Sequence, residues 1–141
     1  MDNHDEREKV RPIQLMQIII VVPKLQESLN KLLRGGNMKY RWAKFYEAQQ
    51  EFDTAVKLYY LENYGPSVHF RGKKVRILYK LYFPTKVKHD YSNYGQKMLD
   101  DSLVKAGIID DDSSYVIQME TLCIRHDKDN PRTEIYIEEA L

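Results

Sequence analysis

The stretch "KKVRILYKLYFP" at residues 73–84 decides the fold, because it is the clearest β-strand signal in the chain. Its apolar side chains recur at every second position, which predicts a strand with one buried face. The alternating residues are Val75, Ile77, Tyr79, Leu81 and Phe83. A second strand is predicted over 13–22, "IQLMQIIIVV", where alternation gives way to a fully apolar run.

The segment before residue 73 predicts a long helix over 38–62. Its apolar residues recur at spacings of three, four or seven, which is typical of one apolar stripe. They are Trp42, Phe45, Phe52, Ala55, Val56 and Tyr59. Lys39, Arg41 and Lys44 lie in the first turns, where the helix dipole disfavours cations, and this hints at an anionic partner. We interpret Trp42 and the tyrosine-rich stretch 59–64 as core and dimer surface rather than as platforms for base stacking.

The segment after residue 84 predicts a short helix over about 94–106, ended by Gly107 at the C′ position, and strands over 115–124 and 133–139. The resulting order, β-α-β-α-β-β, predicts a single α/β (α+β) domain with a mixed sheet and an antiparallel pair at its C-terminal end. The polar, mixed-charge residues 1–12 predict a disordered tail, which leaves 13–141 as the domain.

Composition excludes several classes of protein. A chain of 141 residues fits one domain, and no apolar run approaches the length of about 20 residues that spans a membrane. The polar N-terminus does not resemble a signal peptide. Cys123 is the single cysteine, which excludes a disulfide framework and a cysteine-rich zinc site and predicts a cytoplasmic protein.

The net charge of +1 hides two oppositely charged halves. Residues 31–88 contain 13 basic and 4 acidic side chains, a net charge of +9, whereas residues 89–141 contain 5 and 12, a net charge of −7. Such a chain suits a protein that holds a polyanion with one surface and a divalent metal with another. The alternative is that the two halves neutralise each other across the fold.

Two polar segments flank the short helix, "HDYSNYGQK" at 89–97 and "IIDDDSS" at 108–114. Separately, Asp90 reads as a helix cap and the aspartates of the second segment as a solvated turn. Together, Asp90 and Asp111 or Asp112 can converge at one sheet edge, and clustered carboxylates of this kind bind Mg²⁺ or Mn²⁺. Lys97 lies four residues before Asp101, so the two share a helix face. Lys97 then either forms a surface ion pair with Asp101 or supplies a cation beside a reacting phosphate.

These segments resemble the RusA-type Holliday-junction resolvases, which are small Mg²⁺-dependent endonucleases found widely in phages and prophages. The family pattern is Asp-x-Asp-Asn, then a lysine, Asp-Ala-Leu, Ala-Gly and an Asp-Asp loop. The counterparts in this chain are Asp90, Ser92 and Asn93, then Lys97, the "DSL" that begins at Asp101, Ala106-Gly107 and Asp111-Asp112. "NPRTEIYIEE" at 130–139 and the basic region 28–52 also resemble the family, so the similarity covers nearly all of 13–139.

The resemblance implies a two-fold symmetric homodimer that binds branched DNA, the four-way junction, and nicks two opposing strands. It implies that Asp90 and Asp112 are metal ligands, that Asp111 is a further acid of the metal site, and that Lys97 is the catalytic lysine. The cofactor implied is Mg²⁺, with Mn²⁺ able to substitute. The residues expected to contact DNA are Lys31, Arg34, Lys39, Arg41, Lys44, Lys86, Lys88 and Asn93. A membrane has no role in this reading.

Ser92 departs from the family pattern, which has a metal-binding aspartate at that position. A serine hydroxyl is shorter and neutral, and it is a poorer ligand for a hard cation, so Ser92 is the weak point of the predicted catalytic set. Three explanations are open. Ser92 acts through a bridging water while Asp111 compensates; the protein binds junctions without cutting them; or the serine is an engineered change that makes the enzyme inert.

Overall fold

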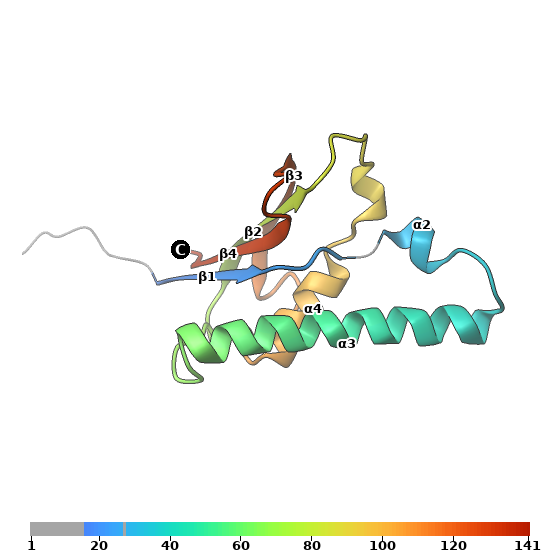
Figure 1. Cartoon of the computed structure of the whole chain (residues 1–141). Coiled ribbons are helices and arrows are strands. Elements are labelled where there is room, and N and C mark those ends of the chain that lie inside the picture. The colour runs from blue at the N-terminus through green and yellow to red at the C-terminus, as the bar shows by residue number, and fades with distance from the viewer. Residues whose placement is uncertain (1–15, 27) are drawn as a thin grey trace, which may run out of the picture.

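The computed structural model describes residues 16–26 and 28–141 (Figure 1). Its elements in chain order are β1 (Gln17–Val22), α2 (Leu29–Leu32), α3 (Met38–Asn63), β2 (Val75–Phe83), the 3₁₀ turn η1 (Tyr91–Asn93), α4 (Lys97–Lys105), β3 (Ile117–His126) and β4 (Arg132–Glu139). The predicted α+β domain with a mixed sheet is confirmed, and α2 and η1 are short additions to it. The predicted tail (1–12) and the start of the strand predicted over 13–22 lie outside the described residues.

The sheet has four strands in the order β1-β4-β2-β3. β4 runs antiparallel to both β1 and β2, whereas β2 and β3 are parallel neighbours. The expectation that the last two strands, β3 and β4, form an antiparallel pair is therefore wrong. β4 does not pair with β3 but inserts between β1 and β2. Thr133, Ile135 and Ile137 of β4 are fully buried, which suits a central strand. β3 leaves most of its side chains at least partly exposed, which suits the edge of the sheet.

Helices α3 and α4 cover one face of the sheet and enclose the core (Figure 1). The buried alternation predicted for β2 is confirmed at all five of its apolar positions. Phe52 and Val56 of α3 and Leu99 and Leu103 of α4 pack against that face. Gly107 follows α4 with a φ of +81°, as predicted for the C′ position. None of the helices in the described ranges is long and apolar enough to cross a membrane.

The apolar stripe predicted for α3 is only partly a core stripe. Phe52 and Val56 are buried, but Trp42 is 66% exposed, so its assignment to the core is wrong. The buried residues of α3 begin at Gln49, and the first turns of the helix extend past the sheet (Figure 1). Helical periodicity shows which side chains share a face, but it does not show how far the surface beneath that face extends.

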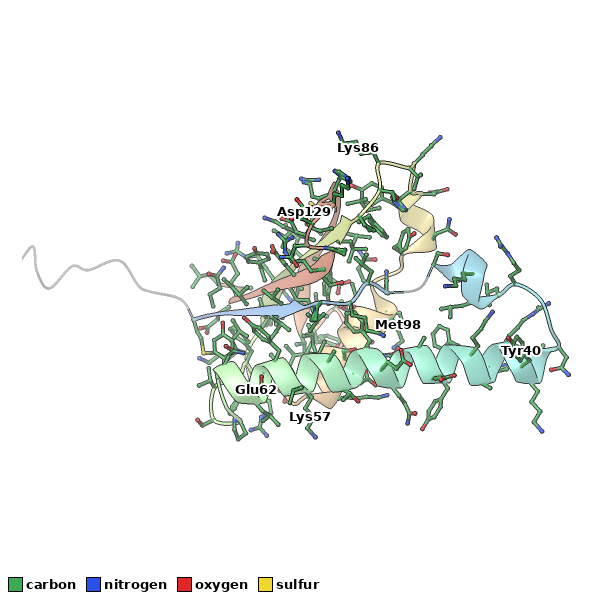
Figure 2. All side chains as sticks on the ribbon, in the orientation of Figure 1. Tyr40, Lys57, Glu62, Lys86, Met98 and Asp129 are labelled. Atoms are coloured by element: carbon green, nitrogen blue, oxygen red, sulfur yellow. The ribbon has the colours of Figure 1, made fainter. Side chains whose placement is uncertain are left out.

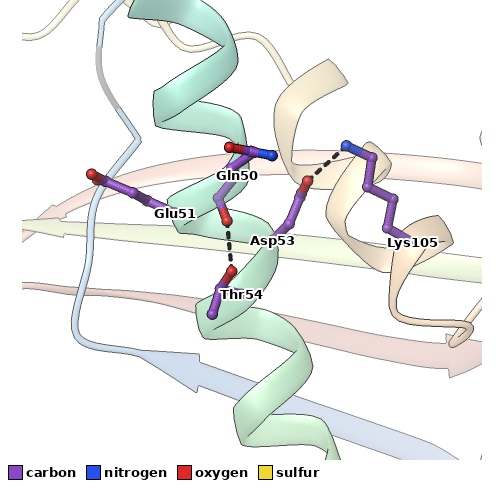
Figure 3. A pocket seen from close by; sticks show the side chains of 5 residues that line it. All are labelled: Gln50, Glu51, Asp53, Thr54 and Lys105. Atoms are coloured by element: carbon purple, nitrogen blue, oxygen red, sulfur yellow. Dashed lines mark hydrogen bonds and ion pairs between the residues drawn. The ribbon is translucent and has the colours of Figure 1, made fainter.

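A buried polar cluster joins α3 to α4. Asp53 Oδ1 accepts hydrogen bonds from Gln49 Nε2 and Ser102 Oγ, both at 2.7 Å. Asp53 Oδ2 pairs with Lys105 Nζ at 2.8 Å, and Figure 3 shows this contact. Gln49 also donates to the Met98 carbonyl at 3.0 Å. These bonds fix the position of α4 along α3, because each group is satisfied in only one alignment of the two helices.

A second cluster joins α4 to the sheet beneath it. The Asp100 carboxyl is 5% exposed; it accepts a hydrogen bond from the Tyr79 hydroxyl of β2 and shares another with Glu120 of β3. Burial, and then the bond to Glu120, raises the pKa of Asp100 to about 8. Asp100 is therefore protonated at neutral pH, which lets it donate to Glu120 while it accepts from Tyr79.

We predict that Asp53→Ala destabilises the protein by about 2 kcal/mol, because it removes the carboxylate that accepts from both Gln49 and Ser102 and that pairs with Lys105. The matched control is Glu51→Ala in the same helix, whose side chain is 54% exposed against 14% for Asp53. It should cost less than about 0.5 kcal/mol. Urea unfolding measures both, and equal losses would contradict the role given to Asp53.

We predict that Asp100 gives folding a distinctive pH dependence. Its folded pKa lies above that of an exposed aspartate, so the folded protein keeps a proton that the unfolded chain releases. The stabilisation that this proton gives the folded protein is therefore greatest below about pH 4, and it is lost as the pH rises through about 8.

The expected difference in unfolding free energy between the natural protein and Asp100→Asn shrinks by roughly 1 to 3 kcal/mol from about pH 5 to about pH 8. Denaturant titrations across this range measure it. Asp129→Asn, at an exposed turn position, serves as the control and should follow the natural profile. Parallel profiles for the natural protein and Asp100→Asn would show that Asp100 does not carry the proton.

Candidate active site in the crossover between β2 and β3

The predicted catalytic residues all lie in the segment that connects β2 to β3. Since these strands are parallel, the connection must cross a face of the sheet and return to the starting edge. It does so through η1, α4 and the acidic loop 110–114. The predicted residues stand at the entry to this crossover and at its exit, on either side of α4.

Lys97 joins the start of α4 to the acidic loop. Its Nζ lies 2.7 Å from Asp112 Oδ2 and 3.1 Å from Asp101 Oδ1. The predicted proximity of Lys97 and Asp101 is thus confirmed, and the structure adds Asp112, 15 positions after the lysine. Hydrogen bonds to Asp112, and then to Asp101, raise the pKa of Lys97, and the bond from Lys97 lowers the pKa of Asp112. Both groups are therefore charged at neutral pH.

The other acids of the loop are engaged by backbone groups. Asp110 accepts from the Gly72 amide at 2.6 Å, and Asp111 Oδ1 accepts from the Asp112 amide at 2.8 Å. The interpretation of the aspartates as part of a turn is correct to this extent. Asp112 differs from them, because its side chain is directed to Lys97 and is only 26% exposed.

Asp90 does not cap α4. The N-cap of α4 is Gln96, which makes no side-chain capping bond. The Asp90 carbonyl instead accepts from the Asn93 amide at 3.0 Å, which closes the turn η1 that contains Ser92. The capping interpretation fails because this extra turn separates Asp90 from the helix. The Asp90 side chain is exposed at the entry to the crossover.

The described residues contain no group of three histidine, cysteine, aspartate or glutamate side chains placed to hold a metal ion. The acids that the sequence indicated are oxygen donors of the type that Mg²⁺ prefers, and Mg²⁺ is commonly held by one or two carboxylates together with substrate phosphate oxygens. The chemistry of Asp90, Asp111 and Asp112 therefore fits the ion, although the chain alone does not gather them into one cluster of this kind.

Sequence reasoning missed the contact between Asp100, which is buried, and Glu120, which is half-buried. Asp100 is linked to the acidic loop through charge, because the negative charge of Asp112 is one of the causes that raise the Asp100 pKa. A signal for Asp100 was present, since it lies three residues before Leu103 on the core side of α4. No comparable signal marked Glu120, whose contact with Asp100 depends on how α4 lies over β3.

The predicted DNA-contacting residues fall into two groups. Lys31, Arg34, Lys39, Arg41 and Lys44 lie in α2, in the first turns of α3 and in the corner between these helices, and Lys86 and Lys88 lie in the exposed loop after β2. Asn93 is half-buried in η1, at the entry to the crossover.

Two of the basic side chains also stabilise the α2–α3 corner. Lys44 Nζ donates to the carbonyls of Lys31 and Arg34 at 2.8 and 3.3 Å, and Arg41 Nε donates to the Gly35 carbonyl at 3.2 Å. The cations that the helix dipole disfavours thus satisfy carbonyl groups of the preceding segment.

The shallow hollow drawn in Figure 3 lies elsewhere, against the α3–α4 joint. It is lined by Gln50, Glu51, Asp53, Thr54 and Lys105. None of these residues belongs to the predicted catalytic set, and Asp53 and Lys105 are paired with each other. The hollow is a consequence of helix packing, so the crossover remains the candidate active site.

Comparison with known protein families places the chain in one family. A sequence model of the endodeoxyribonuclease RusA family matches residues 20–138. No curated protein sequence matches the chain. The matched range runs from β1 to β4 and includes the whole crossover with Lys97, Asp101 and Asp112. The chain therefore belongs to the RusA family of endodeoxyribonucleases, which act on Holliday junctions.

Proposed function

We propose that this protein is a Mg²⁺-dependent endonuclease that resolves four-way DNA junctions by paired, symmetric nicks in recombination and repair. The observation that carries the proposal is the contact of Lys97 with Asp112, which assembles the lysine and the acidic loop into one charged site. Membership of the RusA family supplies the class of reaction. A junction substrate also implies action in the cytoplasm of a bacterial or phage-infected cell.

Asp90, Asp111 and Asp112 are the residues that would hold the metal ion in this proposal. A bound Mg²⁺ or Mn²⁺ supplies charge stabilisation at the phosphate and an activated water for phosphodiester hydrolysis. Asp112 suits this use because the bond from Lys97 keeps its carboxylate ionised. Carboxylates from one chain, together with phosphate oxygens of bound DNA, would fill the shell that the described residues leave incomplete.

Lys97 has a separate task in the proposal. Its ammonium group remains protonated and 73% exposed, so it is available to a DNA phosphate once the acids have another cation to neutralise them. A fixed positive charge next to the phosphate stabilises the extra negative charge of the transition state. In the protein without DNA, Lys97 holds Asp101 and Asp112 in place.

The basic groups at the α2–α3 corner and in the loop after β2 would hold the phosphate backbone. Backbone contacts position the DNA but carry no sequence information, which suits recognition of shape. We propose a homodimer because a junction presents two equivalent scissile strands, and a two-fold symmetric protein matches two such sites at once.

A second candidate function follows from Ser92. With serine at the position of a family aspartate, the site has one negative charge fewer, and the protein could bind junctions while cutting them weakly or not at all. Binding resides chiefly in the basic groups and cutting in the crossover. The two activities are therefore separable by substitution.

We predict that Ser92→Asp increases the rate of junction nicking in Mg²⁺ at least about tenfold, because it restores a carboxylate for a hard cation. Labelled junctions, incubated with the natural protein and the variant side by side, measure the rate, and gel shifts without metal measure binding. Strong binding by both proteins with no nicking by either would refute the nuclease assignment. Selective nicking by the variant alone would establish the second candidate function for the natural protein.

We predict that Asp112→Asn, and separately Lys97→Met, slow nicking by about 10²-fold or more, because each removes charge from the site of phosphate chemistry. Both are made in whichever protein cuts faster, the natural one or Ser92→Asp. The control is Asp110→Asn, whose amide oxygen can still accept from Gly72. It should leave the rate within about twofold. Losses of equal size in all three variants would point to a general structural role for the loop.

A further inference from the structure

The exposed start of α3 presents a row of large apolar side chains. Met38, Trp42 and Tyr46 are 72%, 66% and 61% exposed and follow one another at intervals of four residues, so they share one helix face. We call these three residues the α3 aromatic stripe. Tyr40, 55% exposed, lies at the same end of the helix, which extends beyond the sheet (Figure 2). An exposed row of this kind usually marks a contact surface.

The folded chain does not use this face for its own core. The buried residues of α3 begin at Gln49, beyond the stripe. Trp42 contacts Phe45 edge-on, with ring centroids 6.5 Å apart, and the indole remains largely open to solvent. Exposing a tryptophan and a tyrosine without a partner forfeits the free energy that their burial would supply.

The start of the helix that carries the stripe is capped and hydrogen-bonded to the corner that precedes it. Asn37 caps it by accepting from the Tyr40 amide at 2.9 Å. Arg41 and Lys44 bind the carbonyls of the preceding corner, as described above. The rings are thus presented on a fixed scaffold, which limits the conformational entropy lost when they bind something.

The charge around the stripe selects among possible partners. Residues 31–46 contain five basic side chains and no acidic one. In a two-fold dimer formed through this face, the same patch would meet itself and place these positive charges against one another. The positive charge favours a polyanion instead, and the exposed rings favour a partner with accessible flat apolar groups. DNA has phosphates throughout, and it has accessible base faces wherever its bases are unstacked.

We propose that the α3 aromatic stripe, with Trp42 at its centre, stacks on unstacked bases at the branch point of DNA. This inference rests on the proposed function and deepens it. Phosphate contacts by the surrounding cations favour any DNA, whereas base stacking requires an open base face. The stripe would therefore supply selectivity for branched or single-stranded DNA over duplex.

Trp42 provides its own reporter, because it is the single tryptophan of the chain. We expect its fluorescence to be quenched when the protein binds a four-way junction or a single-stranded oligonucleotide in the absence of metal. Binding to a duplex with the same arm sequence should change the fluorescence much less. These titrations use the full chain and need no cleavage.

Substitution separates stacking from general apolar contact. Trp42→Leu keeps an apolar side chain but removes the ring face, and we expect it to weaken junction binding about tenfold with little effect on duplex binding. Trp42→Phe should retain most of the affinity. Leu58→Ala is the control, since Leu58 is an exposed apolar residue (56%) of the same helix outside the basic segment.

Three outcomes would overturn the stacking proposal. If the protein binds junctions selectively while Trp42 fluorescence is unchanged and Trp42→Leu binds like the natural protein, the stripe is not the contact and the proposed function stands. If Trp42→Leu changes the sedimentation of the protein alone, the stripe is a protein–protein surface. If the protein binds no DNA, the proposed function fails, and the stacking proposal fails with it.

Discussion

β2 and β3 lie side by side and run in the same direction, so the chain between them must leave the sheet, cross a face and return. This constraint determines where the candidate active site forms. The crossover contains α4, and α4 is fixed on two sides. Asp100 binds Tyr79 and Glu120 in the sheet, and Ser102 binds Asp53 of α3. With α4 held in this way, Lys97 at its start reaches Asp112 in the loop after its end.

The two oppositely charged halves of the chain occupy different parts of this fold. The acidic half contributes most of the crossover, the edge strand β3 and β4, and the basic half contributes β2, α3 and the corner that precedes α3. The chemistry would take place at the crossover, while the DNA would be held in part by a helix end that lies beyond the sheet. A change such as Ser92 can therefore affect cutting without affecting the surface that binds.

Much of the fold could be predicted from the sequence, because periodicity reports which side chains are buried. The alternation in 75–83 identified β2 and its inner face correctly, and Gly107 marked the end of α4. The position of β4 between β1 and β2 could not be predicted, since adjacent strands in the chain commonly pair and no local pattern states otherwise. The exposure of Trp42 could not be predicted either, because it depends on where the sheet beneath α3 ends.

In the candidate site, too, local spacing could be predicted from the sequence, whereas contacts between distant segments could not. Lys97 and Asp101 share a helix face by spacing alone, but the contact of Lys97 with Asp112 depends on the path of the acidic loop. The contact between Asp100 and Glu120 depends on the docking of α4 over two strands, which a single sequence does not state. The family resemblance singled out Asp112 as a metal ligand where spacing left Asp111 and Asp112 equivalent, and Asp112 is the one of the two that pairs with Lys97.

The positions of the nicks in a four-way junction test the central claim most directly. Each strand of the junction is labelled in turn and incubated in Mg²⁺ with the Ser92→Asp variant, and the products are resolved at nucleotide resolution. The account predicts paired nicks at symmetry-related positions in two opposing strands, with the matched duplex left intact. Nicks scattered along all four strands and the duplex, or no nicks in a junction that is bound, would contradict it.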